Sequence, residues 1–580
     1  MTSYLSSPVD YLRKLIEKST SKLVKKIPSF EIESKKIEQF GDYSSNIAFL
    51  LAPFLKQSPL KTAQKIKEEI LKNDSWLEKV EIAGGGFLNF FFKKEFWIKA
   101  LNFFPKIKKA PKSKKKPTVI IEYSSPNIAK PMHVGHFRST LLGDFLANLY
   151  QYLGGWKVLR WNHLGDWGTQ FGKLIVAYKK WGDKKKIEKN PISELLALYV
   201  KFHQEAKKNK NLEEAARNEF KKLEEGDKEN RKLLDWFARE SLKEFHQIYK
   251  TLGLKEFDVE KGESQYEKEN IQTIKLLKKN NLLVESQGAL IVDLKEENLP
   301  PALIQKSDGT TLYLTREISS LLYRIKKVKN LSRILYVVGS EQSLHFQQLT
   351  GILKKLKERG VIKNPPLIEH ISFGIVLGAN KKKLSTREGR IIKAQDLIKQ
   401  VIQEARKIVN TKRKELPLKE REKIAQAVGI GALKYGFLKE GRNSTLIFDP
   451  QKFLSLIGNS APYLQYTLVR LKSILKKSSH ITKKEKNRWE EVGALELALI
   501  RKIISFREVL IKCQKESSSH ILTDYLFELA VKINEFYEKI PILKDENLSR
   551  KKFRLLLIKK AAFVLEEGLK ILGITAIEKI

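Results

Sequence analysis

Two histidines, His133 and His136, stand three residues apart in the segment EYSSPNIAKPMHVGHFR (122–138) and flank Gly135. Imidazoles can donate hydrogen bonds to phosphate oxygens as charge develops in a transition state, and a glycine lets a flat base approach the backbone. This spacing therefore favours a nucleotide as the ligand. A pair of structural histidines would produce the same short pattern, so the motif alone leaves both interpretations open.

A second candidate segment, KKKLSTREGR (381–390), follows the apolar run ISFGIVLG (371–378). Lys383 and Arg387 would place positive charge on a leaving pyrophosphate from the opposite side of such a site, and a loop could close over it. An ordinary basic surface loop has the same composition.

The elements around the histidines predict a sheet that carries its ligands at one edge. Residues 118–123 (TVIIEY) have the β-branched composition of a buried parallel strand, residues 133–154 have helical apolar spacing, and KVLRWN (157–162) is a second strand candidate. A strand, a helix and a strand within roughly 40 residues form the unit of a doubly wound, Rossmann-type α/β fold, whose ligands lie beyond the carboxyl ends of the strands. Strand signals return at ALIVDL (289–294), TLYLT (311–315) and RILYVVG (333–339).

We expect the α/β domain at residues 118–414. Outside it, the sequence predicts three further parts. Residues 1–104 combine helical and strand patterns, as expected of an N-terminal α+β domain. Residues 105–117 contain seven Lys, three Pro and no acid, which is typical of a solvated linker. The charged, mainly helical stretch near 183–300 resembles an insertion, and 415–580 is predicted to be α-helical.

The composition narrows the class of protein. The chain has 580 residues and a formal net charge of +43, which would attract nucleic acid, although a general spread of Lys over solvated faces would give the same total. Its one cysteine, Cys513, excludes an internal disulfide and a cysteine-based zinc cluster, and we expect no bound metal. No apolar run approaches the length of a membrane span, so we expect a soluble, cytoplasmic protein without a membrane partner.

Taken together, the two signatures and several longer segments resemble one family. An H-x-G-H motif after the first strand and a K-x-S-x-R loop after a late strand are the paired signature of class I aminoacyl-tRNA synthetases. EYSSPNIAKPMHVGHFRST, RWNHLGDWGTQFG, SDGTTLYLTREI and KKLSTREG resemble the catalytic motifs of arginyl-tRNA synthetases, in that family's order. NSAPYLQYTLVRLKSIL and LFELAVKINEFYEKIPIL resemble its helical anticodon-binding domain, and FGDYSSNIAFLLA with GGGFLNFFF resembles its N-terminal additional, tRNA-binding domain.

The resemblance implies a set of catalytic and ATP-binding residues. His133 and His136 would contact ATP phosphates, Gly135 would pack beneath adenine, and Lys130 matches a lysine near the α-phosphate. Lys383, Ser385 and Arg387 stand in the second signature, where Leu384 replaces a methionine that is common in the family. ATP is the expected co-substrate, with Mg²⁺ carried on its phosphates.

The resemblance also implies an arginine pocket. The five donors of a planar guanidinium are best bound by the acceptor oxygens of carboxylates, amides or phenols. The residues that match pocket positions of the family are Glu122, Ser125, Asn127, Tyr313, Glu317 and Gln342, with Asn127 at the α-amino end. Glu317 departs from the family, which usually has Asp there.

The implied activity is arginine–tRNA ligation, with L-arginine, ATP and tRNA(Arg) as partners and tRNA required for efficient activation. The residues expected to contact tRNA are Asn459, Tyr463, Tyr466, Asn534 and Tyr537, and we expect a monomer. Two alternatives are a catalytically inactive paralogue that only binds RNA and a small-molecule nucleotidyltransferase with the same His-Gly-His fold. The intact signatures oppose the first alternative, and the N-terminal and helical parts oppose the second.

Overall fold

The computed structural model describes residues 7–34, 38–104, 116–377, 393–447, 458–478 and 492–578. Contacts divide the chain into two compact units, each of which is described by itself. The first unit comprises described residues of 1–108, 466–513 and 524–568, and the second comprises those of 109–465, 514–523 and 569–580. The expected domain boundaries at residues 104, 117 and 414 stay predictions, and most of the expected linker lies outside the described residues.

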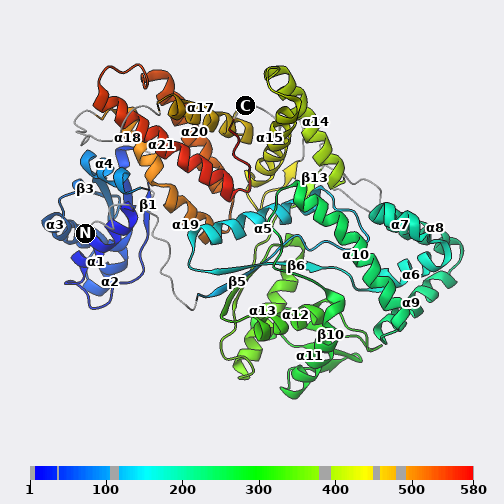
Figure 1. Cartoon of the computed structure of the whole chain (residues 1–580). Coiled ribbons are helices and arrows are strands. Elements are labelled where there is room, and N and C mark those ends of the chain that lie inside the picture. The colour runs from blue at the N-terminus through cyan, green and yellow to red at the C-terminus, as the bar shows by residue number, and fades with distance from the viewer. Residues whose placement is uncertain are drawn as a thin grey trace. The chain divides into compact units, whose positions relative to one another are not determined.

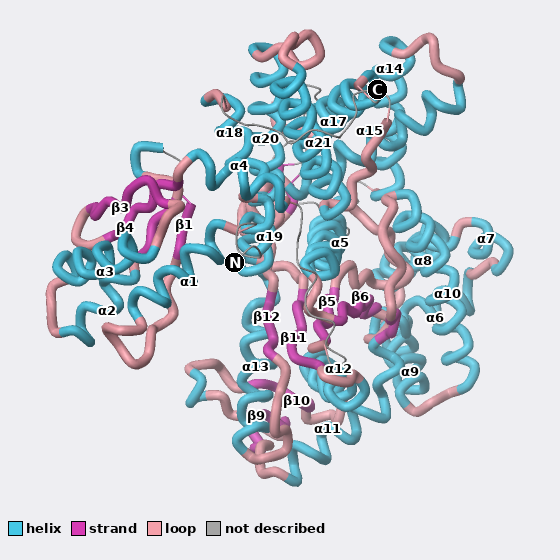
Figure 2. The backbone as a smooth tube through the Cα atoms, turned by 60° about the vertical axis from the view of Figure 1, so that its left-hand side comes forward, coloured by secondary structure: helices cyan, strands magenta, loops and turns pink. Residues whose placement is uncertain are grey.

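A five-stranded parallel sheet organises the second unit. The strands are β5 (Thr118–Glu122), β6 (Lys157–Leu164), β7 (Val259–Gly262), β11 (Leu331–Tyr336) and β12 (Leu367–His370), in the order β12-β11-β5-β6-β7. Neighbouring strands are visible side by side in Figure 2. From β5 the chain adds strands first in one direction (β6, β7) and later in the other (β11, β12). A doubly wound sheet binds its ligands at the carboxyl ends of the strands where this direction changes, which here is the carboxyl end of β5. This confirms the predicted α/β fold.

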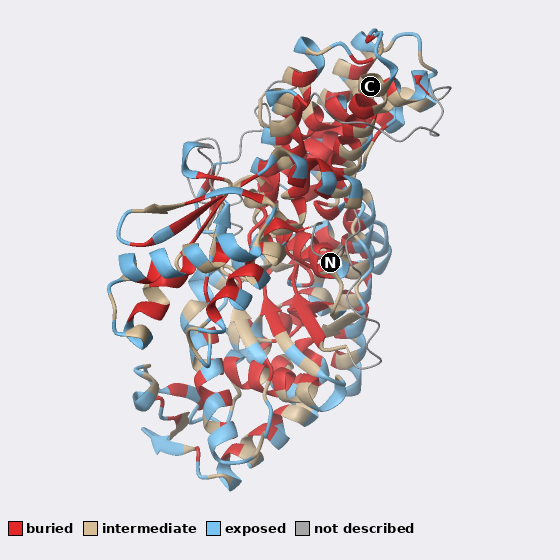
Figure 3. Ribbon diagram, turned by 90° about the vertical axis from the view of Figure 1, so that its left-hand side faces the viewer, coloured by how far each residue is buried: buried red, intermediate tan, exposed pale blue. Residues whose placement is uncertain are grey.

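Helices cover both faces of this sheet (Figure 1). Helix α5 (Val134–Leu153) lies on one face, and Gly143 permits this because a Cβ there would come within 2.2 Å of the Tyr123 ring. Helices α12 (Tyr313–Lys327) and α13 (Ser343–Glu358) lie on the other face, where Ile318 and Phe346 pack with Ile120 and Trp161. All five residues of β5 are buried. Figure 3 shows buried residues, in red, on strands and helices in the interior of the second unit.

The prediction of a strand at TLYLT (311–315) is wrong. Helix α12 begins at Tyr313, and only Thr311 makes an isolated bridge, with Gln305. The β-branched and aromatic residues suggested a strand, but Leu314, Ile318 and Leu321 recur at helical spacing and are buried on one face of the helix. Tertiary burial of this face outweighs the local preference for a strand.

The region expected to hold the mainly helical insertion contains both helices and strands. Helix α6 (Thr169–Trp181) lies just before this region, which begins with the helices α7 (Lys184–Lys189), α8 (Pro191–Lys208), α9 (Asn211–Glu224) and α10 (Lys228–Thr251). Phe171, Leu195, Phe220 and Phe237 lie in the core around these helices. Strand β7 then returns to the main sheet. After η2 (Glu263–Tyr266) and α11 (Glu267–Lys279), strands β8 (Val284–Ser286), β9 (Ala289–Val292) and β10 (Ala302–Gln305) form a small antiparallel sheet, with η3 (Lys295–Glu297) between the last two.

The second unit continues after β11 with η4 (Ser340–Gln342) and α13. Strand β13 (Val376–Leu377) pairs with β14 (Leu446–Ile447), and between them the described chain forms α14 (Ala394–Lys412) and α15 (Leu418–Leu438). The two-residue strand β14 interrupts the helical pattern predicted from residue 415 onward. The remaining described helices, most of whose residues belong to the first unit, confirm the predicted helical carboxyl-terminal part. They are α17 (Ala461–Lys477), α18 (Ala494–Ile504), α19 (Phe506–Glu516), α20 (His520–Lys539) and α21 (Leu548–Ile571).

The first unit begins with the predicted α+β part. Strands β1 (Ile32–Ser34), β2 (Tyr43–Ser45), β4 (Phe87–Phe92) and β3 (Leu77–Ala83) form an antiparallel sheet in that order, accompanied by α1 (Pro8–Thr20), η1 (Glu38–Phe40), α2 (Ile47–Leu55), α3 (Pro59–Asn73) and α4 (Lys94–Phe103). This part contacts the later helices of the same unit. The Tyr43 hydroxyl donates to Glu508 at 3.0 Å, and Arg501 pairs with Asp42 at 3.0 Å.

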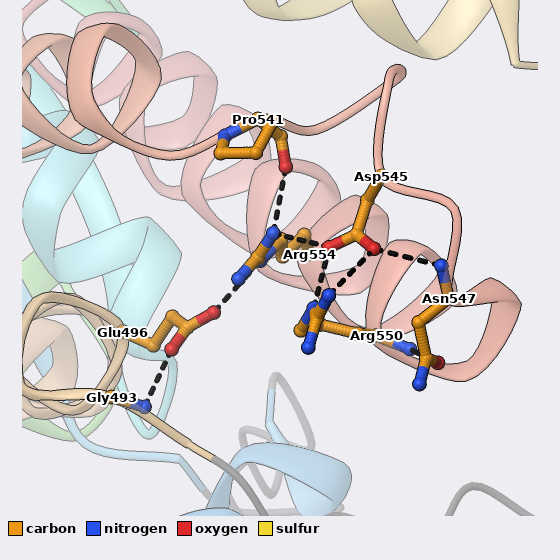
Figure 4. Close-up of polar contacts among 7 residues, drawn as sticks. All are labelled: Gly493, Glu496, Pro541, Asp545, Asn547, Arg550 and Arg554. Carbon is orange, nitrogen blue, oxygen red and sulfur yellow. Dashed lines mark hydrogen bonds and ion pairs between the residues drawn. The ribbon is translucent and has the colours of Figure 1, made fainter.

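A buried ion network joins α18 and α21 in the first unit (Figure 4). Arg554 donates from Nε to Glu496 at 2.9 Å and from Nη1 to Asp545 at 2.5 Å. Asp545 also accepts from Arg550 at 2.6 Å, and Glu496 accepts the Gly493 N–H at 2.6 Å. The second oxygen of Asp545, Oδ1, accepts from Arg550 at 3.0 Å and from the Asn547 N–H at 2.9 Å. Every oxygen of the two buried acids therefore has a partner, as burial of charge requires. Among the described residues, no helix is long and apolar enough to cross a membrane.

Candidate active site

The two predicted histidines lie together at the start of α5, after the loop that follows β5. His133 is the N-cap of α5, and its Nδ1 accepts the Gly135 N–H at 3.1 Å. His136 reaches back, and its Nδ1 accepts the His133 N–H at 3.1 Å, so the two rings form a capping box with centroids 4.0 Å apart. Each side chain thereby satisfies a backbone donor that the helix leaves without an intrahelical partner.

This arrangement sets the protonation state of both rings. Because Nδ1 of each ring accepts a hydrogen bond, each neutral imidazole carries its hydrogen on Nε2. Burial lowers the pKa of His133, and burial, then repulsion from His133, lowers that of His136 to about 3. Both rings are therefore neutral near pH 7, and each has one N–H donor left for a ligand.

The glycine and the lysine of the motif have defined neighbours. A Cβ at Gly135 would come within 2.9 Å of the His133 ring, so glycine is needed for the ring to lie over the first turn of α5. Lys130 donates from Nζ to Gln170 of α6 at 2.8 Å. The second signature, with Lys383, Ser385 and Arg387, lies outside the described residues, and its placement stays a prediction.

At the carboxyl end of β5, Glu122 stands between Tyr336 of β11 and Trp161 of β6 in the sheet register. Its Oε2 lies 2.5 Å from Nη2 of Arg324, and both side chains are buried. The Arg324 guanidinium also stacks on the Trp161 ring, 4.8 Å from its centroid. The predicted pocket acid therefore already has an internal cation as its partner.

Glu317 lies in the same buried cluster without such a partner. The residue is 2% exposed, and its Oε1 has no hydrogen-bond partner. Burial, then repulsion from Glu122, raises the pKa of Glu317 to about 8, so the side chain holds a proton at neutral pH. The neighbouring acid Glu263 is paired with Arg316 at 2.8 Å. Among these three acids, Glu317 is the one whose charge lacks a paired guanidinium.

The other predicted pocket residues lie around the same edge of the sheet. The Tyr313 hydroxyl donates to Gln342 at 3.4 Å, and the Tyr313 ring packs on that of His345 with centroids 4.6 Å apart. Ser125 accepts no hydrogen bond at its buried hydroxyl, while its backbone N–H donates to Asn162 at 3.0 Å. Asn127 is exposed and bridges to Gly165, just beyond the end of β6.

Two residues of the cluster had no role in the sequence interpretation. His163, at the carboxyl end of β6, is 5% exposed, and neither ring nitrogen has a hydrogen-bond partner. Burial, then the charges of Arg324 and Arg316, holds its pKa well below the usual value, so it is neutral. Its position in NHLGDWGTQFG was the available signal. Arg324 had no comparable signal, because its partner Glu122 is 202 residues away in the chain.

Three of the predicted RNA-contacting residues form a surface cluster in the first unit. Arg470 of α17 donates to the Tyr466 hydroxyl at 3.0 Å and to Asn534 of α20 at 3.1 Å. Its guanidinium lies over the rings of both Tyr466 and Tyr537, at 4.8 Å and 5.1 Å from their centroids. Tyr466 is 46% exposed and Tyr537 is 41% exposed, so planar groups remain available on the surface. The sequence interpretation had not included Arg470.

The remaining two predicted RNA contacts, Asn459 and Tyr463, belong to the second unit. The Asn459 side chain accepts from the Tyr435 hydroxyl of α15 at 2.5 Å, and the Tyr463 N–H donates to Ser460 at 3.4 Å. These contacts hold the start of α17, and the role of both residues in RNA binding stays a prediction.

Family models match most of the chain. Residues 101–450 match the model described as tRNA synthetases class I (R), catalytic domain, residues 464–580 match the DALR anticodon binding domain, and residues 10–92 match the arginyl tRNA synthetase N terminal domain. The solved arginyl-tRNA synthetase of Plasmodium falciparum superposes with a TM-score of 0.82 at 26% identity, covering 98% of each chain. That of Thermus thermophilus has the same TM-score at 22% identity, covers 98% of this chain and 99% of its own, and supports the fold alone.

Curated relatives are similar over nearly their whole length. The arginine–tRNA ligase of Clostridioides difficile is 40% identical over 557 residues, covering 94% of this chain and 95% of the relative. That of Fusobacterium nucleatum is 38% identical over 560 residues, covering 96% of each. Together with the paired histidines at the carboxyl end of β5, these matches show that the chain belongs to the arginyl-tRNA synthetase family of class I.

Proposed function

We propose that this chain activates L-arginine with ATP, giving arginyl adenylate and pyrophosphate, and then transfers arginine to the 3′-terminal adenosine of tRNA(Arg). The observation that carries this proposal is the 40% identity to a curated arginine–tRNA ligase across 94% of the chain. Membership of the family, with the class I catalytic model over residues 101–450, supplies the reaction type.

The buried acids supply recognition of arginine. Glu317, protonated while the pocket is empty, gives up its proton when a guanidinium arrives and then forms a charge-assisted hydrogen bond. Glu122 contributes a second carboxylate whose orientation Arg324 holds. Tyr313 and Gln342 supply a phenol and an amide at the edge of the pocket, and Ser125 and Asn127 receive the α-amino end.

The histidine pair supplies stabilisation of the phosphates. The arginine carboxylate attacks the α-phosphorus in line, and no side chain forms a covalent intermediate. The Nε2–H groups of His133 and His136 donate to phosphate oxygens, and neutral donors of fixed orientation need no reorganisation as charge develops. Lys130 adds positive charge near the α-phosphate, Gly135 receives the adenine face, and Mg²⁺ arrives with ATP as part of the substrate.

The second signature completes this set. Lys383 and Arg387 carry positive charge to the leaving pyrophosphate, and Ser385 donates to ATP. These roles rest on the resemblance of KKLSTREG to the family signature.

Binding of tRNA falls to the two outer parts of the chain. Tyr466, Tyr537 and Asn534, with Arg470 between the two rings, offer stacking faces and hydrogen-bonding groups to unstacked bases of the anticodon loop. We propose Asn459 and Tyr463, which belong to the second unit, as separate contacts to the tRNA. We propose that the protein acts as a monomer in the cytoplasm.

The test is pyrophosphate exchange with each of the twenty amino acids, in the presence and absence of tRNA(Arg). Exchange that depends on arginine and is increased by tRNA is expected. Exchange with another amino acid would contradict the arginine assignment. RNA binding without any exchange would instead support the inactive paralogue.

A further inference from the structure

The loop that connects β5 to α5 holds three residues in an unfavourable backbone conformation. Ser124, Ser125 and Ala129 have φ angles of +69°, +43° and +59°, in the left-handed region that residues with a Cβ rarely adopt. Such residues persist only where the surrounding structure holds them, and they concentrate at functional sites. The same loop carries Lys130 and leads into His133.

Helix α10 contacts two of these three residues directly. The Ser241 hydroxyl accepts the Ala129 N–H at 3.0 Å, and the Tyr249 hydroxyl lies 2.7 Å from the Ser124 hydroxyl. Ser241 and Tyr249 are buried and lie about two turns apart on the helix. Neither residue belongs to the sequence segments that resemble the catalytic motifs.

The third residue is connected to α10 through the neighbouring strands. The Ser125 N–H donates to Oδ1 of Asn162 at 3.0 Å, and Nδ2 of Asn162 donates to Oε1 of Glu260 at 2.8 Å. The other oxygen of Glu260 lies 2.5 Å from Nε2 of His246 on α10. Asn162 belongs to β6 and Glu260 to β7, so this relay crosses the edge of the main sheet.

We infer that helix α10 holds the loop 123–133 in the conformation that the reaction requires, with Ser241, Tyr249 and Asn162 as positioning residues. They act through Ser124, Ser125 and Ala129. This inference rests on the proposed function, because Ser125, Asn127 and Lys130 of the loop are assigned there to the substrates. Helix α10 of the insertion would then determine the geometry of the arginine and ATP contacts without contacting either substrate.

Two conservative variants test the direct contacts. Tyr249→Phe keeps the buried ring and loses the hydroxyl that contacts Ser124 and Asn162. Ser241→Ala removes the hydroxyl that accepts the Ala129 N–H. Each should raise the arginine KM in pyrophosphate exchange by about three- to tenfold, as loss of one hydrogen bond does, while the melting temperature stays within about 2 °C. Tyr178→Phe is the matched control, because the Tyr178 ring packs on Trp236 and Phe237 of the same helix, and its hydroxyl forms no hydrogen bond with Ser124, Ser125 or Ala129.

A charge swap tests the relay. Asn162→Asp should raise the arginine KM at least tenfold, because two carboxylates would meet where Nδ2 now donates to Glu260. Glu260→Gln alone should have an effect below about threefold, since an amide can still accept that hydrogen bond. The double variant N162D/E260Q should recover most of the lost affinity, because the new amide donates to the new carboxylate and the Ser125 N–H keeps an acceptor. If the double variant were no better than Asn162→Asp, the relay would be refuted.

Hydrogen exchange gives a readout that needs no substrate. The amides of Ser125 and Ala129 should exchange faster in Ser241→Ala, Tyr249→Phe and Asn162→Asp than in the parent protein and in Tyr178→Phe. Unchanged exchange together with KM values within twofold of the parent would overturn the inference. Absence of arginine-dependent exchange of pyrophosphate in the parent would instead contradict the proposed function, and amide exchange would still decide the role of α10.

Discussion

Glu317 is a single residue whose protonation should be visible in the use of arginine. Its pKa of about 8 belongs to the empty pocket, where burial and Glu122 disfavour the charged form. A bound guanidinium favours the charged form, so arginine must displace the proton at every pH below about 8. We expect the arginine KM to rise as pH falls from 8.5 to 6.5, by up to about tenfold for each pH unit below the pKa.

The variant Glu317→Gln separates this proton from other pH effects. It should weaken arginine use by about 2 to 4 kcal/mol, because a charge-assisted hydrogen bond in a buried pocket is lost while the charge of the ligand remains. Its arginine KM should also depend much less on pH between 6.5 and 8.5. An arginine KM within about threefold of the parent would place the substrate guanidinium elsewhere.

The histidines serve both the helix and the proposed reaction, and one substitution separates the two tasks. Asparagine is a good N-cap, so His133→Asn should keep the hydrogen bond to the first turn of α5 and preserve the melting temperature. It lacks the Nε2–H donor, and the exchange rate should fall about a hundredfold with little change in the arginine KM. Near-normal turnover in His133→Asn would show that the ring acts only as a cap.

The sequence predicted these residues unequally. His133, Gly135 and His136 were identifiable because the motif lies within four consecutive residues at a strand-to-helix junction. The pairing of Glu122 with Arg324 was not, because a buried ion pair depends on which distant residues tertiary packing brings together. The unpartnered His163 and the guanidinium of Arg470 between two tyrosines were missed for the same reason.

At the scale of elements, prediction succeeded where the local pattern and the tertiary environment agree. Strand β5 and helix α5 have uniform apolar patterns and lie in the core, so periodicity alone identified both. The prediction of a strand at 311–315 failed because these strand-like residues begin helix α12, and the burial of α12 depends on β11 and α13. Strand β7 was missed because only its pairing with β6 makes its charged sequence a strand.

The network between α18 and α21 predicts a large stability effect from one residue. Arg554→Met would leave Glu496 without its guanidinium partner and remove one of the two arginines that bind Asp545. Breaking a buried pair on one side costs about 3 to 5 kcal/mol, so urea unfolding of the helical part should shift by that amount. Arg550→Met is the matched control and should cost clearly less, because Asp545 keeps Arg554. Equal losses in the two variants would contradict the central role of Arg554.

At the scale of the whole molecule, the α/β fold and the helical carboxyl-terminal part could be predicted from the sequence, whereas the position at which RNA binds could not. A net charge of +43 predicts attraction to any polyanion and says nothing about where a particular RNA binds. We propose the cluster of Tyr466, Arg470, Asn534 and Tyr537 as that position, because exposed rings and a stacked guanidinium suit unstacked bases better than phosphates.

Arg470 therefore allows stacking to be distinguished from charge in the binding of tRNA. If its guanidinium orders the two rings, Arg470→Lys should weaken tRNA(Arg) binding almost as much as Arg470→Met, by about tenfold, because an ammonium keeps the charge and loses the planar fork. The dependence of log Kd on log salt should keep the parental slope in both variants, since no phosphate contact is lost. Lys476→Met, which removes a charge from an exposed position of the same helix, is the control for non-specific attraction. Filter binding between 50 and 200 mM salt measures all three variants. Normal binding by Arg470→Lys, with a slope in Arg470→Met that is smaller by about 1, would identify Arg470 as a phosphate contact and refute its stacking role.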